Sequence, residues 1–165
     1  MAKMKTTQVK RWCAPPEKDD ERINRLKTPQ DCEIFERNVT ERGFPELAAR
    51  ARRRAVELRV AEHNVQNDIE KETLAALYAH EKILMSVNGK KTKASGSWLI
   101  LKRRGTVAAI KSMTASEKSE MYFSKLKEHG LEDFSFEAIV VKHTTMFEPD
   151  MVDRCAARLK SLQSN

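Results

Sequence analysis

From residue 28 onward, apolar residues recur every three or four positions, as they do on one face of an α-helix. In residues 45–63 the recurring apolar residues are Leu47, Ala51, Ala55, Leu58 and Ala61. In residues 68–88 the corresponding stripe is Ile69, Thr73, Ala76, His80, Ile83 and Val87. Charged residues fill the other faces, so the pattern predicts two long amphipathic helices.

Residues that start and stop helices flank these segments. Thr28 before Pro29 is a typical helix start, and Asn67 can cap the helix at residues 68–88. Gly43 and Gly89 stand where glycine commonly ends a helix. Because the links between the predicted helices are short, an antiparallel bundle is the expected arrangement.

The second half of the chain shows the same signals. Ser95 or Ser97 can cap a helix that Gly105 ends, and Thr106 can cap the next one. Further amphipathic segments are residues 117–129, 135–143 and 149–162. The apolar runs WLIL and AIVV could each be a buried strand, but the flanking caps favour helix. We therefore predict an all-α fold, a compact bundle of about seven helices.

Residues 1–27 differ from the rest of the chain. They contain few aliphatic residues, a Pro15-Pro16 pair and a basic start, and such a segment cannot bury enough apolar surface to offset its chain entropy. We predict a flexible basic arm at residues 1–27 and a single helical domain at residues 28–165. Trp12 could anchor the arm to a partner or dock on the protein's own core.

Composition excludes several classes of protein. The chain has 165 residues, of which 40% are hydrophobic, 33% charged and 6% aromatic, which is typical of a water-soluble globular domain. The sequence contains neither an apolar run long enough for a membrane helix nor a secretory signal, so we expect a cytoplasmic protein without membrane contact. Its three cysteines are far apart and give no disulfide framework.

The net charge of +7 comes from one part of the chain. Between Glu81 and Glu117 there is no acidic residue, but there are eight basic ones. The remainder is nearly neutral, with 23 basic residues left from 31 against 24 acidic ones. A local surplus of this kind is typical of a surface that binds a polyanion. The other interpretation is an ordinary solvated face.

Motifs for catalysis and metal binding are absent from the sequence. We find no G-x-S-x-G, no phosphate-binding glycine loop, no H-E-x-x-H, and no acidic residue followed two positions later by lysine. The four histidines are isolated, and His80 on the helical stripe fits a structural role better than that of a ligand. We expect Glu72 and Glu81 to pair with Arg50 or Arg54. These observations favour a protein that is not an enzyme, with no cofactor and no metal.

The candidate binding residues are therefore basic residues and hydroxyls near two predicted helix ends. They are Lys90, Lys91, Lys93, Ser95, Ser97, Lys102, Arg103, Arg104 and Lys111, together with Arg50, Arg53 and Arg54 of the arginine-rich helix. We expect nucleic acid as the partner, with DNA favoured, bound by a basic helix-turn-helix-like segment. The alternative is a protein-interaction module, such as a regulator or inhibitor that docks its basic face on an acidic or nucleic-acid-bound protein.

Five blocks of sequence cover roughly residues 34–160: RGFPELAARARRRAVELR, TLAALYAHEKIL, NGKKTKASGSWLILKRRGTVAAIKSM, HGLEDFSFEAIVVKH and FEPDMVDRCAARL. In this order they resemble a family of small, all-helical bacterial proteins of unknown function. Thr92 to Ser95 fit the family's lead into a helix, whereas Gly96 stands where members commonly have arginine. The resemblance implies one ordered unit with a functional centre near residues 90–111, and it implies no activity.

Overall fold

The computed structural model of the chain describes residues 20–163, and most of this range is helical. It contains nine α-helices and two short 3₁₀ turns, and no strand. The α-helices are α2 (Glu21–Asn24), α3 (Pro29–Glu41), α4 (Pro45–Ala61), α5 (Asp68–Asn88), α6 (Ser95–Arg104), α7 (Thr106–Ala115), α8 (Ser119–Glu128), α9 (Phe136–Lys142) and α10 (Pro149–Gln163). The 3₁₀ turns are η1 (Glu132–Phe134) and η2 (Thr144–Met146). The all-α prediction is confirmed for this part of the chain, and the expected number of about seven helices was approximate.

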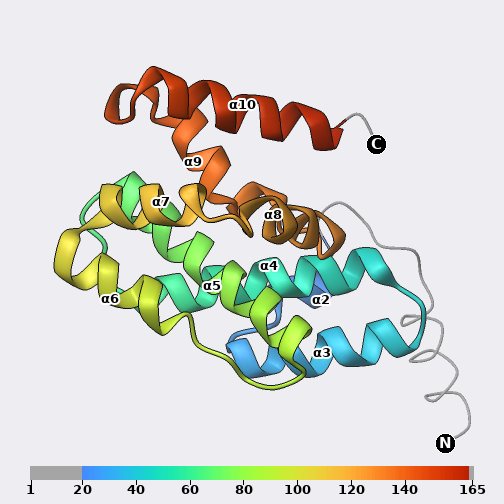
Figure 1. Cartoon of the computed structure of the whole chain (residues 1–165). Helices are drawn as coiled ribbons and strands as arrows, with labels where there is room; N and C mark the ends of the chain where they lie inside the picture. The colour runs from blue at the N-terminus through green and yellow to red at the C-terminus, as the bar shows by residue number, and fades with distance from the viewer. Residues whose placement is uncertain (1–19, 164–165) are drawn as a thin grey trace, which may run out of the picture.

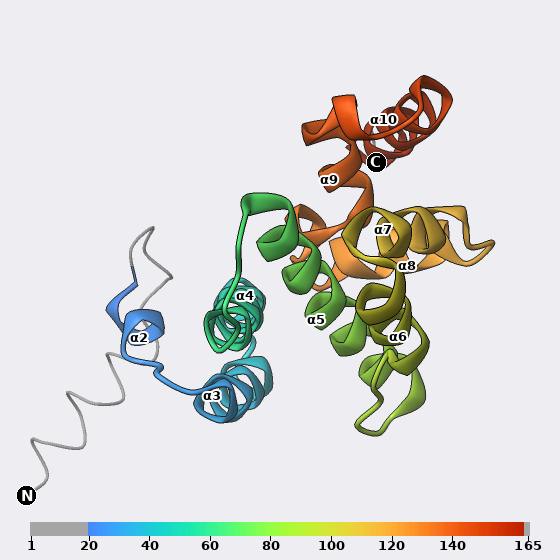
Figure 2. The ribbon, with the colours of Figure 1, turned by 90° about the vertical axis from the view of Figure 1, so that its left-hand side faces the viewer.

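Helix α5 is the central element of the fold. Figures 1 and 2 show α3 and α4 on one side of it, α6, α7 and α8 on the other, and α9 and α10 across one end. Buried side chains occur on every face of α5, and several of them are small, as at Ala75, Ala76 and Ala79. Small side chains allow neighbouring helices to pack closely on both sides of α5, which suits this helix to the centre of the fold.

Three groups of buried residues hold the layers together. The first joins α5 to α7, α9 and α10 around Leu77 and Ile110. The second joins α4 and α5 to α8 around Val60 and Ile83. The third, around Leu47, lies between α3 and α4. The N-terminal half of α4 thus packs on α3, and its C-terminal half packs on α5.

The predicted boundary between arm and domain at residue 28 was approximate. Residues 20–27 contain the short helix α2, which packs on α4. Ile23 and Leu26 of this segment pack against the third group of buried residues. Residues 1–19, including Trp12, lie outside the described part of the chain.

Most predicted helix ends are confirmed, because they depend on local chemistry. The side chains of Thr28, Asn67 and Ser135 each accept a hydrogen bond from a backbone amide in the first turn of the following helix. Two predicted caps are wrong. Helix α6 begins after Ala94 and α7 after Gly105, and neither has a side-chain cap.

The buried face of α4 also differs from the predicted stripe. Val56 and Val60 are buried, whereas Ala61 is exposed. The face rotates along the helix because the two halves of α4 pack against different neighbours.

Gly130 allows α8 to end close against α4. Its φ is +70°, and a Cβ built on it would lie 2.6 Å from the Cβ of Ala49. A side chain at this position would have both an unfavourable backbone conformation and a clash. The close approach places the backbone carbonyls of His129 and Gly130 within reach of arginines on α4.

Within residues 20–163, none of the helices combines the length and the apolar character that crossing a bilayer requires.

Candidate functional site

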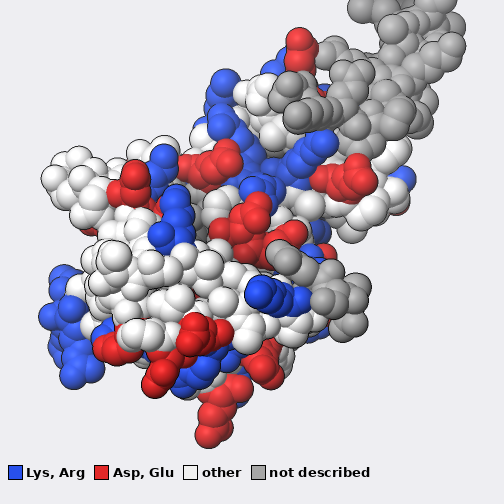
Figure 3. Space-filling view, turned by 90° about the horizontal axis from the view of Figure 1, so that it is seen from above, with Lys and Arg blue, Asp and Glu red and all other residues white. Residues whose placement is uncertain are grey.

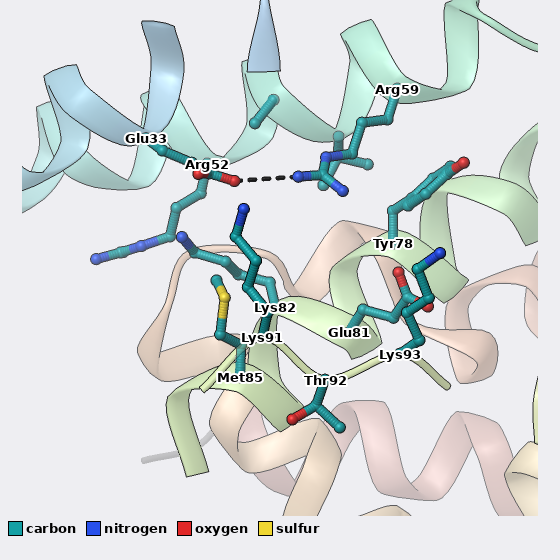
Figure 4. A pocket seen from close by; sticks show the side chains of 12 residues that line it. Glu33, Arg52, Arg59, Tyr78, Glu81, Lys82, Met85, Lys91, Thr92 and Lys93 are labelled. Atoms are coloured by element: carbon teal, nitrogen blue, oxygen red, sulfur yellow. Dashed lines mark hydrogen bonds and ion pairs between the residues drawn. The ribbon is translucent and has the colours of Figure 1, made fainter. Parts of the chain in front are cut away.

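Two neighbouring hollows lie along α5, and we call them together the basic groove. The first, of about 380 Å³, lies where α3, α4 and α5 meet the loop at residues 89–94 (Figure 4). The second, of about 600 Å³, lies between the end of α4, the middle of α5 and the exposed side of α6. The two adjoin, since both are lined by Arg59, Tyr78, Glu81 and Lys93. Their basic lining residues are Arg52, Arg59, Lys82, Lys91, Lys93 and Lys102, against the acidic residues Glu33 and Glu81.

Three of these basic residues are fixed by ion pairs. The carboxylate of Glu36, whose side chain is largely buried, accepts from Arg52 Nε at 2.7 Å and from Lys82 Nζ at 2.6 Å. Glu33 pairs with Arg59 at 3.0 Å (Figure 4). These contacts tie α3 to α4 and α5. The three cations therefore stabilise the fold as well as lining the groove.

The other three basic residues are available to a ligand. Lys91, Lys93 and Lys102 are exposed, and none of them has an ion-pair partner among residues 20–163. Lys91 and Lys93 come from the loop before α6, and Lys102 comes from the last turn of α6. The fold thus brings three uncompensated positive charges to one groove from two directions.

An aromatic cluster forms one wall of the second hollow. The Trp98 ring lies edge-on to Tyr78, with ring centroids 5.2 Å apart, and nearly parallel to His63, with an angle of 14° between the planes. His63 Nε2 and the Tyr78 hydroxyl are hydrogen-bonded at 2.6 Å. Burial, and then the nearby Glu81 carboxylate, raise the pKa of the Tyr78 hydroxyl, so Tyr78 is neutral at physiological pH.

Glu81 fixes α6 against α5 beside this cluster. One of its carboxylate oxygens accepts hydrogen bonds from the indole Nε1 of Trp98 at 2.6 Å and from the backbone amide of Ala94 at 3.0 Å. The guanidinium of Arg59 lies 5.8 Å from the centre of the Tyr78 ring. The cluster is therefore built from α4, α5 and α6 and held by specific polar contacts.

The predicted basic segment lies at an exposed edge of the molecule. Lys90 is exposed in the loop before α6, and Arg103 and Arg104 are exposed in the last turn of α6, next to Lys102. Figure 3 shows basic side chains gathered at the edge where α6 meets α7, whereas basic and acidic residues are interspersed over the rest of that face. Lys111 is different, because its ammonium is bonded to the Glu148 carboxylate at 2.6 Å.

The other predicted arginines are not brought to the groove. Arg53 pairs with Asp133 at 3.0 Å and lies over the Phe134 ring at 5.0 Å. Arg54 donates to the backbone carbonyl of Leu26 at 3.3 Å. Neither these two residues nor Arg50 lines either hollow. Of the α4 arginines, Arg52 and Arg59 therefore line the groove, and Arg50, Arg53 and Arg54 lie outside it.

The two predicted serines have different positions. Ser95 is exposed and lines the second hollow. The Ser97 hydroxyl instead donates to the Met113 sulfur at 2.9 Å, which directs it toward α7 and away from the groove. The helical twist between the two positions explains the difference.

The predicted pairing of Glu72 and Glu81 with Arg50 or Arg54 is wrong. Glu72 bonds to Lys142 and, at 2.7 Å, to His143 Nε2. Burial opposes ionisation of Glu72, but these hydrogen bonds outweigh it and lower the pKa of its carboxyl. Glu81 bonds to α6 as described above. The prediction assumed that Glu72 contacts the helix next to it in the sequence. Its partner Lys142 instead lies in α9, 70 residues further along the chain.

His80 lies in the interior, where the stripe pattern placed it. Its side chain is buried, and the ring of Tyr122 contacts it edge-on at 4.5 Å between centroids. Burial lowers the pKa of His80 to about 4, so the imidazole is neutral at physiological pH. It therefore belongs to the packing of α5 against α8.

A third hollow, of about 870 Å³, lies on the side of α5 that faces α9. Its charged lining residues are Glu57, Asp68, Glu72 and Asp133 against Lys71 and Lys142. The surplus there is acidic, which is unfavourable for a polyanion. Among the described residues, no group of three or more His, Cys, Asp or Glu side chains is arranged to hold a metal.

No protein-family model, curated protein or solved structure matches the chain. The family resemblance therefore stays a prediction, and the case for a function depends on the geometry of the site.

Proposed function

We propose that this protein is a non-enzymatic nucleic-acid-binding protein, with DNA the favoured partner, that binds through the basic groove and the adjoining end of α6. The observation that carries the proposal is a set of exposed basic residues without ion-pair partners among residues 20–163, in a stretch of sequence that contains no acid. The set is Lys90, Lys91, Lys93, Lys102, Arg103 and Arg104.

Charge compensation distinguishes these six residues from Arg52, Arg59 and Lys111, which are paired with carboxylates. A cation already paired with a carboxylate gains little from a phosphate, because the new contact replaces an existing one. An exposed lysine or arginine without a partner instead releases the counterion of the phosphate that it neutralises. Contacts to about five phosphates would make the logarithm of the binding constant fall with the logarithm of salt concentration with a slope of about −4 to −5.

Helices α6 and α7 have the outline of a helix-turn-helix but not its standard form. Only Gly105 separates them, with φ of 88° and ψ of 179°, whereas the standard unit has a turn of three or four residues. The basic residues of α6 lie in its last turn, although recognition helices read bases with their N-terminal residues. The position of these basic residues therefore favours contacts to the phosphate backbone over contacts to base edges.

The test is fluorescence anisotropy of labelled DNA, titrated with protein at several salt concentrations. Reversing Lys102, Arg103 and Arg104 to Glu should weaken binding at least a hundredfold and flatten the salt slope, because three of about five phosphate contacts become repulsive. The Gln triple variant, which avoids placing acids at the C-terminal end of a helix, should weaken binding in the same direction. Circular dichroism checks that both variants are folded.

The matched control reverses Arg37, Lys118 and Lys127 to Glu. These residues are exposed, lack ion-pair partners among the described residues and lie outside the groove. Either triple reversal lowers the net charge from +7 to +1. If both triple variants weaken binding equally, only overall charge matters and the site is wrong. If the wild-type protein binds no nucleic acid at low salt, the function is wrong, and capture of a partner protein after nuclease treatment would then favour the protein-interaction alternative.

A further inference from the structure

The aromatic cluster lies directly beside the unpaired lysines of the groove. His63, Tyr78 and Trp98 line the second hollow together with Lys93 and Lys102. His63 is exposed, and Tyr78 and Trp98 are half-buried, so part of each ring is accessible from the hollow. Leu99, whose exposed fraction is 46%, adds an apolar side chain there. A ligand in this hollow would meet flat apolar surface and positive charge at once.

Polar contacts fix these rings before any ligand arrives. The indole N–H of Trp98 is bonded to Glu81, and the Tyr78 hydroxyl is bonded to His63. Each of the three rings thus has a polar atom bonded within the protein, and the ring surface that lines the hollow is left for contacts with a ligand. A fixed platform loses little conformational entropy on binding.

Binding of phosphates requires positive charge but no aromatic rings, whereas an unpaired base can stack on such rings. Proteins that bind single-stranded nucleic acid combine a basic groove with aromatic side chains on which bases stack. In a duplex the faces of the bases are covered by their neighbours and cannot reach a protein ring. The combination of rings and unpaired lysines therefore selects a single strand over a duplex.

The size and continuity of the groove agree with a strand. Volumes of about 380 and 600 Å³ lie in the range of sites that hold small molecules, so each hollow can accept about one nucleotide. Because they adjoin at Tyr78 and Lys93, a chain can pass from one hollow to the other. Lys91 in the first hollow and Lys102 in the second then lie on either side of this junction.

We propose that the basic groove binds a single-stranded segment of nucleic acid, with an unpaired base stacked in the hollow lined by His63, Tyr78 and Trp98 and with flanking phosphates on Lys91, Lys93 and Lys102. This inference rests on the proposed nucleic-acid-binding function and names its substrate class.

The experiment compares three labelled probes of equal length, about 12 nucleotides, by fluorescence anisotropy at low salt. They are oligo-dT, an abasic strand with the same phosphates, and a duplex that contains the oligo-dT. Oligo-dT should bind about tenfold more tightly than the abasic strand, because stacking contributes to only one of them. It should also bind more tightly than the duplex. In a Trp12→Phe protein, oligo-dT but not the abasic strand should quench the fluorescence of the remaining Trp98.

His63→Ala is the most direct variant, because the His63 side chain is exposed and its loss should leave the fold intact. It should weaken oligo-dT binding severalfold and leave abasic binding unchanged. His63→Phe, which keeps a ring, should restore most of the affinity. Tyr78 and Trp98 both also pack against the core, so Tyr78→Leu, which keeps an apolar side chain but removes the ring, serves as the second variant, with thermal unfolding measured alongside.

The outcomes separate this inference from the proposed function. Equal affinity for oligo-dT and the abasic strand would overturn stacking and leave nucleic-acid binding in place. Tighter binding of the duplex would do the same. If none of the three probes binds, the proposed function itself is overturned.

Discussion

Helix α4 and the segment from Lys90 to Arg104 carry similar positive charge but use it differently. Helix α4 has five arginines, and the segment has six lysines and arginines. The α4 arginines make contacts within the protein, to carboxylates, backbone carbonyls and aromatic rings. The residues of the segment project into solvent without ion-pair partners in the described structure. The positive charge of α4 stabilises the fold, whereas that of the segment from Lys90 to Arg104 is not neutralised within the described structure.

The number of acids within reach explains the difference. Around α4 the fold brings Glu33 and Glu36 from α3 and Asp133 from η1. Around the segment from Lys90 to Arg104, the acidic residues that line the groove are Glu33, which is paired with Arg59, and Glu81, whose carboxylate is occupied by Trp98 and Ala94. A basic run is therefore evidence for a binding surface only once the partners of each cation are known.

Arg52→Met gives the largest expected effect on the α4 side of this comparison. Arg52 bonds to Glu36 and, through a second nitrogen, to the backbone carbonyl of His129 at 3.0 Å. Its loss should lower the free energy of unfolding by about 2 to 3 kcal/mol, because largely buried acceptors lose their donor. Urea unfolding followed by circular dichroism measures the change.

The control for Arg52 is Arg37→Met. Arg37 is exposed on α3, and no ion pair to it is present within residues 20–163. Its replacement should change stability by less than about 0.5 kcal/mol. If the two variants were equally stable, the α4 arginines would be no more structural than surface ones, and the contrast between the two regions would fail.

His80 extends the comparison to a group that the fold keeps uncharged. Its pKa is about 4 in the folded protein and 6.5 for an ordinary histidine, so the unfolded chain takes up a proton first as pH falls. Stability is therefore complete above about pH 6.5 and decreases toward pH 4, by about 2 kcal/mol at about pH 5. Urea unfolding at several pH values, compared with His80→Leu, measures this loss.

The His80→Leu variant keeps the other three histidines, so its difference from the wild-type protein isolates His80. The lowered pKa of Glu72 keeps that carboxyl ionised over the same range. Parallel stability curves for the two proteins between about pH 8 and about pH 5 would show that His80 is not held neutral by burial.

The sequence predicted the parts of the fold that depend on neighbouring residues. Thr28, Asn67 and Ser135 cap helices because a short polar side chain can reach an amide two or three residues later. Helix α2 was missed because it is only four residues long and packs through Ile23 on a group formed by distant residues. Local patterns cannot show such a contact.

The candidate site was predicted only in part for the same reason. Lys91, Lys93 and Lys102 could be found from charge alone. The cluster of His63, Tyr78 and Trp98 could not, because its members come from three separate segments, although Trp98 within the basic segment was a signal. The structural role of Arg52 was equally hidden, since its partners lie 16 and 77 residues away along the chain.

The smallest predicted effect compares two lysines that the sequence treats alike. Lys91 has no ion-pair partner in the described part of the chain, whereas Lys111 is bonded to Glu148. Lys91→Met should reduce the salt slope of DNA binding by about 1, because one phosphate contact and its counterion are lost. Lys111→Met should leave the slope unchanged. Anisotropy titrations at several salt concentrations measure both.

The same pair tests whether intramolecular pairing really decides which cations bind. Lys111 and Glu148 are both substantially exposed, so a Lys111 freed of its ion pair would be accessible to a phosphate. Glu148→Gln should then make Lys111 available and raise the slope, and adding Lys111→Met to that variant should cancel the gain. A slope unaffected by Lys91→Met would place the phosphates elsewhere than the loop before α6.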